Sequence, residues 1–101
     1  MATNTTVLFR GAATTNTATT LYTVPSGRTA IVTNIAINNT ASSARTFTLG
    51  LGGVNLHNTT TIAPNTTIYI DCKQVMVATN QITGGASAAD VAFHISGIEV
   101  F

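Results

Sequence analysis

Residues whose side chains could do chemistry are few in this sequence, and they fit no metal-binding or catalytic motif. The candidates for a metal site are too scattered for the ligand spacings of zinc sites: His57, His94, Cys72 and Asp71. A cysteine nucleophile would need Cys72, His94 and Asp90 together, and no motif places them so. We interpret Cys72 as an inert, buried or half-buried thiol and the others as ordinary strand or loop side chains. No metal and no cofactor is expected.

The acidic side chains give no better basis for catalysis. They allow at most one carboxylate pair for general acid-base chemistry, because the acids are Asp71, Asp90 and Glu99. We expect each acid to lie in solvent or to pair with a basic side chain, which would be Arg10, Arg28, Arg45 or Lys73. The sequence therefore assigns no catalytic residue and predicts a protein that is not an enzyme.

Glycines and tyrosines complete the set of candidate ligand-binding residues. Gly50, Gly52 and Gly53 form no phosphate loop, since neither a helix start nor a lysine follows them. Tyr22 and Tyr69, with nearby asparagines, could line a glycan-binding face. Aromatic residues make up only 6% of the chain, so positions at a sheet edge or an interface are the preferred interpretation of both tyrosines.

The composition indicates a protein that is covered by other protein. Charged residues make up 7% of the chain and hydrophobic residues 45%, with a mean hydropathy of +0.35, whereas an average soluble domain has about 25% charged residues. So few charges would leave a free monomer poorly protected against association, and we expect much of the surface to contact further copies or a larger assembly. The net charge of +1 is too weak to attract nucleic acid.

The sequence predicts one domain without targeting segments. Its 101 residues suit a single core, and one cysteine excludes an intrachain disulfide. No apolar run is long enough to span a membrane, and residues 1–6 do not resemble a signal peptide. We expect residues 1–6 to be a flexible arm and residues 7–101 to form the folded domain.

The stretch from residue 21 to residue 38 sets the expected fold. Residues 21–24 and 29–38 predict two strands joined by a turn, in which Pro25 fixes one backbone angle and Gly27 tolerates positive φ. The longer strand alternates in steps of two, which predicts one apolar face made of Ile31, Thr33, Ile35 and Ile37.

The rest of the chain repeats short strands and turns. Further strands are expected at residues 7–10, 45–51, 54–57, 67–71, 81–87 and 91–101, with a hairpin at Gly52-Gly53. We expect residues 12–20 to be a loop or a weak edge strand, residues 72–78 to include a short helical turn, and a β-bulge to lie near Ser96-Gly97. Seven to eight short antiparallel strands predict an all-β, single-domain β-sandwich of the jelly-roll type.

The sequence resembles small virion proteins of tailed bacteriophages from about residue 20 to residue 101. The resemblance rests on turn-and-strand patterns at residues 21–35, 38–39, 48–53, 62–67 and 94–100. It implies a β-sandwich that assembles on the virion. Within that setting we expect a late protein that decorates the capsid: a homotrimeric cement protein on the outer surface, bound to the major capsid protein and stabilising its lattice.

Two other functions remain open at this stage. The same sandwich could be a structural component of the tail, neck or a fibre. From a different class, it could be a glycan-binding adhesion module that makes weak contact with host-surface glycans through Tyr22, Tyr69 and nearby asparagines. If the protein decorates the capsid, we expect the arm at residues 1–6 or the loop at residues 12–20 to pair through its main chain with an edge strand of the capsid protein.

Overall fold

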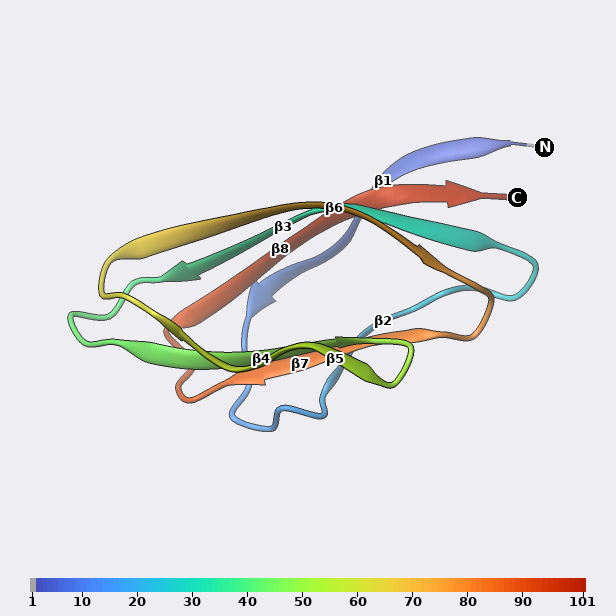
Figure 1. Cartoon of the computed structure of the whole chain (residues 1–101). Coiled ribbons are helices and arrows are strands. Elements are labelled where there is room, and N and C mark those ends of the chain that lie inside the picture. Colours follow the sequence, from blue (N-terminus) through green and yellow to red (C-terminus); the bar gives the residue numbers. More distant parts are fainter. Residues whose placement is uncertain (1) are drawn as a thin grey trace.

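The computed structural model describes residues 2–101 as a sandwich of two antiparallel four-stranded sheets (Figure 1). None of these residues forms a helix, so this part of the chain contains no helix that could span a membrane. The strands are β1 Thr3–Ala12, β2 Thr20–Thr23, β3 Thr29–Asn39, β4 Arg45–Leu51, β5 Val54–Ile62, β6 Thr66–Met76, β7 Gln81–Ala86 and β8 Val91–Val100.

The strand order is that of an eight-stranded jelly roll. The first sheet has the order β1-β8-β3-β6 and the second has the order β2-β7-β4-β5. Each strand of the first half therefore pairs with its counterpart from the second half: β1 with β8, β2 with β7, β3 with β6 and β4 with β5. A single long antiparallel hairpin rolled into two layers gives this pairing. The prediction of an all-β sandwich of the jelly-roll type is confirmed.

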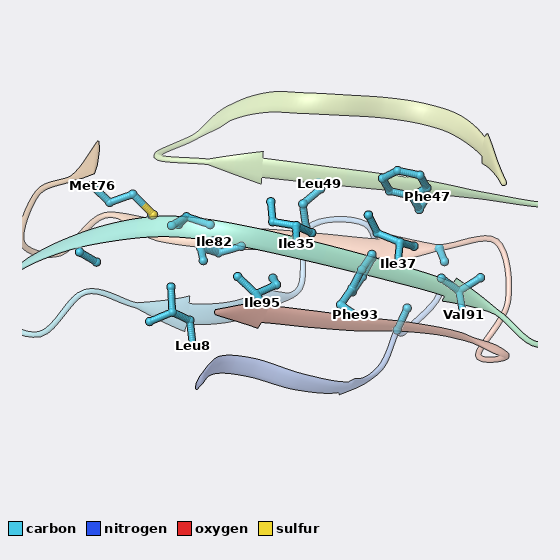
Figure 2. Packing of buried hydrophobic residues seen from close by; sticks show 14 of the residues in the cluster. Leu8, Ile35, Ile37, Phe47, Leu49, Met76, Ile82, Val91, Phe93 and Ile95 are labelled. Atoms are coloured by element: carbon cyan, nitrogen blue, oxygen red, sulfur yellow. The ribbon is translucent and has the colours of Figure 1, made fainter. Parts of the chain in front are cut away.

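The core fills the space between the two sheets (Figure 2). The rings of Phe47 from β4 and Phe93 from β8 meet edge to face, with centroids 6.3 Å apart and an angle of 69° between the planes. Burying a large apolar side chain contributes about 1.5–3 kcal/mol. The fully buried large side chains include Phe47, Phe93, Ile35, Ile37, Leu49, Ile62, Met76, Ile82 and Ile95.

Both turns expected from glycine are present. Gly52 and Gly53 have φ values of 60° and 84° and join β4 to β5 in the predicted hairpin. Gly27 has a φ of 78° in the turn between β2 and β3, where Arg28 N donates to Pro25 O at 3.2 Å. Because positive φ is strained for residues with a Cβ, glycine is the natural residue at these positions.

Strand β3 carries an irregularity that the alternation did not predict. Its register with β8 shifts between Val32 and Asn34, which leaves Thr33 as an extra residue relative to β8. The register with β6 shifts at the same place, but there the extra residue is in β6, where Cys72 and Lys73 stand opposite Thr33. Val32 before the shift is fully buried, and so are Ile35 and Ile37 after it. The expectation that Ile31 and Thr33 share a face with Ile35 and Ile37 is therefore wrong, because the extra residue reverses the alternation.

Strand β8 does not contain the bulge predicted at Ser96-Gly97. Its alternation continues without interruption, so that Gly97 and Glu99 face inward behind Ile95. The register shifts lie in the two neighbouring strands instead, at Thr33 in β3 and between Val7 and Phe9 in β1. This continuity turns a charged side chain, Glu99, into the sandwich, where it is 7% exposed.

Two other segments differ from their expected structure, whereas the loop expected within residues 12–20 is present. The helical turn predicted within residues 72–78 is absent, because β6 continues to Met76. In the segment expected to be a flexible arm, residues 3–6 are the beginning of β1 and pair with residues 97–100 of β8; residue 1 lies outside the described residues. Residues 13–19 form a loop that is tied to β7 by hydrogen bonds from Gly84 N to Thr19 O and from Ala86 N to Thr14 O, each 2.9 Å long.

Candidate functional site

Polar side chains gather on the outer face of the first sheet, the face turned away from the core. On β8, His94 lies between the buried Phe93 and Ile95 and is therefore directed outward. The strand register places it beside Arg10 of β1 and Ala36 of β3, and Ala36 in turn lies beside Tyr69 of β6. These four residues form one row across the sheet, which we call the central row.

The central row contains a small residue between larger ones. Neighbouring strands lie about 4.8 Å apart, so the backbones of His94 and Tyr69, two strands apart, are separated by about 10 Å. Between them stands only the methyl group of Ala36. The Tyr69 side chain is 72% exposed. A trough therefore runs over Ala36, with the tyrosine on one side and His94 and Arg10 on the other.

The rows on either side of the central row supply amides and hydroxyls. Register places Ser96, Asn34 and Asp71 side by side in one neighbouring row. The other neighbouring row includes Asn38 and Thr67. Together with the central row they line a hollow of about 340 Å³: Arg10, Asn34, Ala36, Asn38, Thr67, Tyr69, His94 and Ser96.

Hydrogen bonds fix the amides of this hollow. Asn34 Nδ2 donates to Asp71 Oδ1 at 3.1 Å, and Asn38 Nδ2 donates to Thr67 Oγ1 at 2.8 Å. The Oδ1 atom of Asn38 is buried and has no hydrogen-bond partner among residues 2–101. A buried acceptor without a donor is costly, so this amide is not yet fully satisfied.

Arg10 differs from two of the other basic residues in having no acidic partner. Arg28 forms an ion pair with Glu99 at 2.9 Å and Arg45 forms one with Asp90 at 3.0 Å. Within residues 2–101 no ion pair involves Arg10. The guanidinium of Arg10 is thus an uncompensated positive charge at one side of the hollow.

The two tyrosines, grouped in the sequence as one platform, lie in different environments. Tyr22 Oη donates a hydrogen bond of 2.5 Å to Glu99 Oε2, and Arg28 Nη1 donates one of 2.9 Å to Glu99 Oε1. Burial raises the pKa of the Tyr22 phenol, and the hydrogen bond to Glu99 raises it further. The Arg28 guanidinium also lies 3.9 Å from the centre of the Phe101 ring. Tyr22 is therefore engaged in a tie between the two sheets, so the alternative of a glycan platform made of two tyrosines would retain only Tyr69.

The residues considered for nucleophilic catalysis are not brought together. Cys72 packs against the core from β6, and its Sγ donates to Val32 O at 3.4 Å. Burial raises the pKa of this thiol, which makes it a poorer nucleophile. His94 is on the opposite face of the same sheet, and Asp90 accepts two hydrogen bonds from Arg45, at 3.0 and 3.2 Å. That contact lowers the pKa of Asp90.

The metal-site candidates are equally dispersed. The His57 ring packs against Phe47, with centroids 5.3 Å apart, and Asp71 is bonded to Asn34. In the part of the chain that the structure describes, no three histidine, cysteine or acidic residues are grouped as metal ligands.

Comparison with known proteins gives a limited result. No protein-family model and no curated protein matches the chain. The solved structures that resemble it include two of a pentameric capsid protein isolated from metagenomic phage sequences. Each has 22% sequence identity to this chain and a TM-score of 0.40. The matches cover 95% of this chain but only 59% and 60% of the two capsid chains, so this chain spans about three fifths of their length.

Proposed function

We propose that this chain is a non-enzymatic structural protein of a tailed-phage virion, and within the virion a decoration protein bound to the outer surface of the major capsid lattice. The observation that carries the proposal is the exposure of large apolar side chains on a surface with very few charges. Val54, Val75 and Val77 are 72%, 66% and 58% exposed, in a chain with 7% charged residues. Such a surface favours burial against other protein.

The exposed apolar residues are concentrated at sheet edges. Val54 is in β5, Val75 is in β6 and Val77 follows β6 directly, and these strands are the edges of the two sheets on one side of the sandwich. An edge strand also offers unpaired backbone N–H and C=O groups to a further strand. We therefore assign the β5–β6 edge, defined by these two strands and Val77, as the principal surface for contact with copies or with capsid protein.

The first part of β1 offers a second route to the capsid. Thr3 to Thr6 pair with β8 on one side, and because β1 is an edge strand its other side is open. The earlier expectation of an arm that adds to a capsid strand thus becomes a proposal about the open edge of β1. Several modest contacts from a homotrimer would reinforce one another through effective concentration.

The decisive experiment is a reconstruction of the intact virion at side-chain resolution. We expect density for this chain on the outer capsid surface, as trimers above the junctions of major capsid subunits, with the β5–β6 edge in contact. Density in the tail, neck or a fibre would contradict the decoration role and support the alternative structural role. Absence of the chain from the virion would overturn both.

A binding assay tests the assigned edge separately. Capsids lacking this protein are incubated with wild-type protein, with the Val75→Lys/Val77→Lys variant, or with Ala89→Lys as a control for added charge in the exposed loop before β8. Because a desolvated lysine is costly in an apolar contact, we expect the double variant to lose most of its occupancy and the control to keep it. Equal occupancy of all three proteins would exclude this edge.

A further inference from the structure

We propose that the hollow on the outer face of the first sheet binds an acidic saccharide, that is, a sugar carrying a carboxylate group. Tyr69 would stack on the sugar ring, and Arg10 with His94 would bind the carboxylate. This inference is independent of where the protein sits in the virion. It also differs from the glycan platform considered as an alternative in the sequence analysis, because it excludes Tyr22 and adds two donors.

The shape of the hollow suits one sugar ring. His94 and Tyr69 are two strands apart, which places their backbones about 10 Å from each other. Each side chain occupies part of that width, and the methyl group of Ala36 keeps the floor between them low. A ring lying over Ala36 would contact the tyrosine on one face while its substituents reach His94 and Arg10.

Tyr69 has the exposure required for stacking. Its ring is 72% exposed although it stands in a row with three other outward-facing residues. An aromatic ring has an apolar face, and the phenol group at its tip remains available to water or to a hydroxyl. The C–H face of a sugar ring would cover this surface without burying a polar group.

The unpaired guanidinium selects a ligand with negative charge. Arg10 has no ion pair within residues 2–101, and the register places it directly beside His94. A guanidinium binds a carboxylate through two parallel hydrogen bonds, and a neighbouring imidazole N–H can add a third. Asp71, in the adjacent row at the Tyr69 side, would repel a carboxylate, so the acid group is directed toward Arg10.

The remaining groups of the hollow fit sugar hydroxyls. Asn34 and Ser96 present an amide and a hydroxyl on the other side of the floor from Asn38 and Thr67. Asn38 and Thr67 are bonded to each other at 2.8 Å, so they present a fixed polar wall to the ligand. The lining of the hollow is therefore mostly polar, unlike the surface around the exposed Val54, Val75 and Val77, and this contrast favours a hydrophilic ligand over a second copy of the chain.

The test is a titration of the ¹⁵N-labelled full chain, followed by NMR, with a tetrasaccharide of galacturonic acid and with its fully methyl-esterified form. The two probes differ in charge but share the ring. We expect shift changes at Arg10, Asn34, Asn38, Tyr69 and His94 with the acid, and binding that is about tenfold weaker with the ester. Added salt should weaken binding of the acid only.

Variants separate the two contributions. Tyr69→Ala is expected to weaken binding of both probes at least tenfold, and Arg10→Gln to remove the preference for the acid while binding of the ester persists. Lys73→Gln, which removes a charge from an exposed position of β6 outside the hollow, serves as the matched control and should bind like wild type. Unchanged ¹⁵N spectra away from each mutation would show that the variants are folded.

Five results would overturn the proposal. No shift change at millimolar tetrasaccharide, or equal binding of acid and ester, would contradict an acidic saccharide. Shift changes outside the hollow, or binding unaffected by Tyr69→Ala, would contradict this site. Concentration-dependent shifts of the same residues without sugar would instead assign this face to contact with a second copy.

Discussion

Asn39 is a buried amide that closes one end of the sandwich. It is the last residue of β3 and is 1% exposed. Its Nδ2 lies 3.0–3.2 Å from the carbonyl oxygens of Ser43, Ile62 and Ala63, and its Oδ1 accepts from Ala41 N at 2.9 Å. One side chain therefore satisfies backbone groups of both the β3–β4 connection and the end of β5. The sequence did not indicate this role, since the second asparagine of a polar run looks like any turn residue.

Removing this amide should destabilise the fold. Asn39→Ala leaves several buried carbonyl and amide groups unsatisfied, and we expect a loss of about 2–4 kcal/mol in the free energy of unfolding. Asn39→Asp should be at least as harmful, because a carboxylate cannot donate to the three carbonyls. Chemical denaturation measures the effect, with the exposed Asn58→Ala as the control. A change below about 0.5 kcal/mol for Asn39→Ala, the range of ordinary surface substitutions, would contradict this role.

The tie between Tyr22 and Glu99 predicts a loss of stability in alkali. The folded state raises the pKa of the Tyr22 phenol above its ordinary value of about 10. The contribution to stability is therefore fully present below pH 10 and is lost as the pH rises through the folded-state pKa. Thermal unfolding between pH 8 and pH 12 should show a decline above pH 10 that is smaller in Tyr22→Phe. An identical decline in both proteins would show that other groups cause it.

At the level of the strands, the packing around β8 depends on Gly97. The strand turns this glycine inward, between the irregular parts of β1 and β3. A Cβ at Gly97 would press against the carbonyl oxygen of Ile31 and would lie 2.8 Å from Leu8 Cδ1. The backbone of β3 approaches closely here because the neighbouring strands, not β8, carry the extra residues.

Gly97→Ala is therefore expected to destabilise the protein by about 1–3 kcal/mol, the usual cost of overpacking a core. Gly11→Ala is a suitable control, since a Cβ there would meet only the Phe9 ring at an ordinary distance of 3.4 Å. Urea unfolding of the two variants measures the difference. Equal stability of both would mean that β3 can move aside at no cost.

The sequence predicted elements well where one local signal determines them. The Gly52-Gly53 hairpin and the turn at Gly27 follow from residues that tolerate positive φ, and both are present. Which residues of β3 and β8 face the core could not be predicted, because the alternation along a strand depends on where an extra residue lies in a paired strand. Two apolar residues after Gly97 suggested that β8 changes phase, whereas Ile98 in fact faces outward and Glu99 inward.

The candidate site was predicted only in part for the same reason. Tyr69 was recognised from its residue type, but its neighbours depend on register: Arg10 and His94 are 84 positions apart in the sequence and adjacent across two strands. Tyr22 was grouped with Tyr69 because nothing local reveals which sheet a short strand joins. Once β8 is known to keep its alternation, the inward position of Glu99 and hence its pairing with Arg28 and Tyr22 follow.

For the whole molecule, the exposed apolar edge predicts self-association. Wild-type protein should form oligomers in sedimentation velocity as its concentration rises, because Val75 and Val77 are more than half exposed. Val75→Lys/Val77→Lys should shift the distribution toward monomer, while Ala89→Lys should not. A wild-type protein that remains monomeric at all concentrations would refute association through the β5–β6 edge.

The pairing of opposite halves of the chain also constrains when the protein can fold. β4 and β5 are adjacent in sequence and can form their hairpin early, whereas β1 pairs in its sheet only with β8, at the far end of the chain. Contacts between distant segments are slow to form. During synthesis on the ribosome, β1 therefore cannot pair with β8 until β8 has left the exit tunnel, so this pairing forms after the β4–β5 hairpin can form.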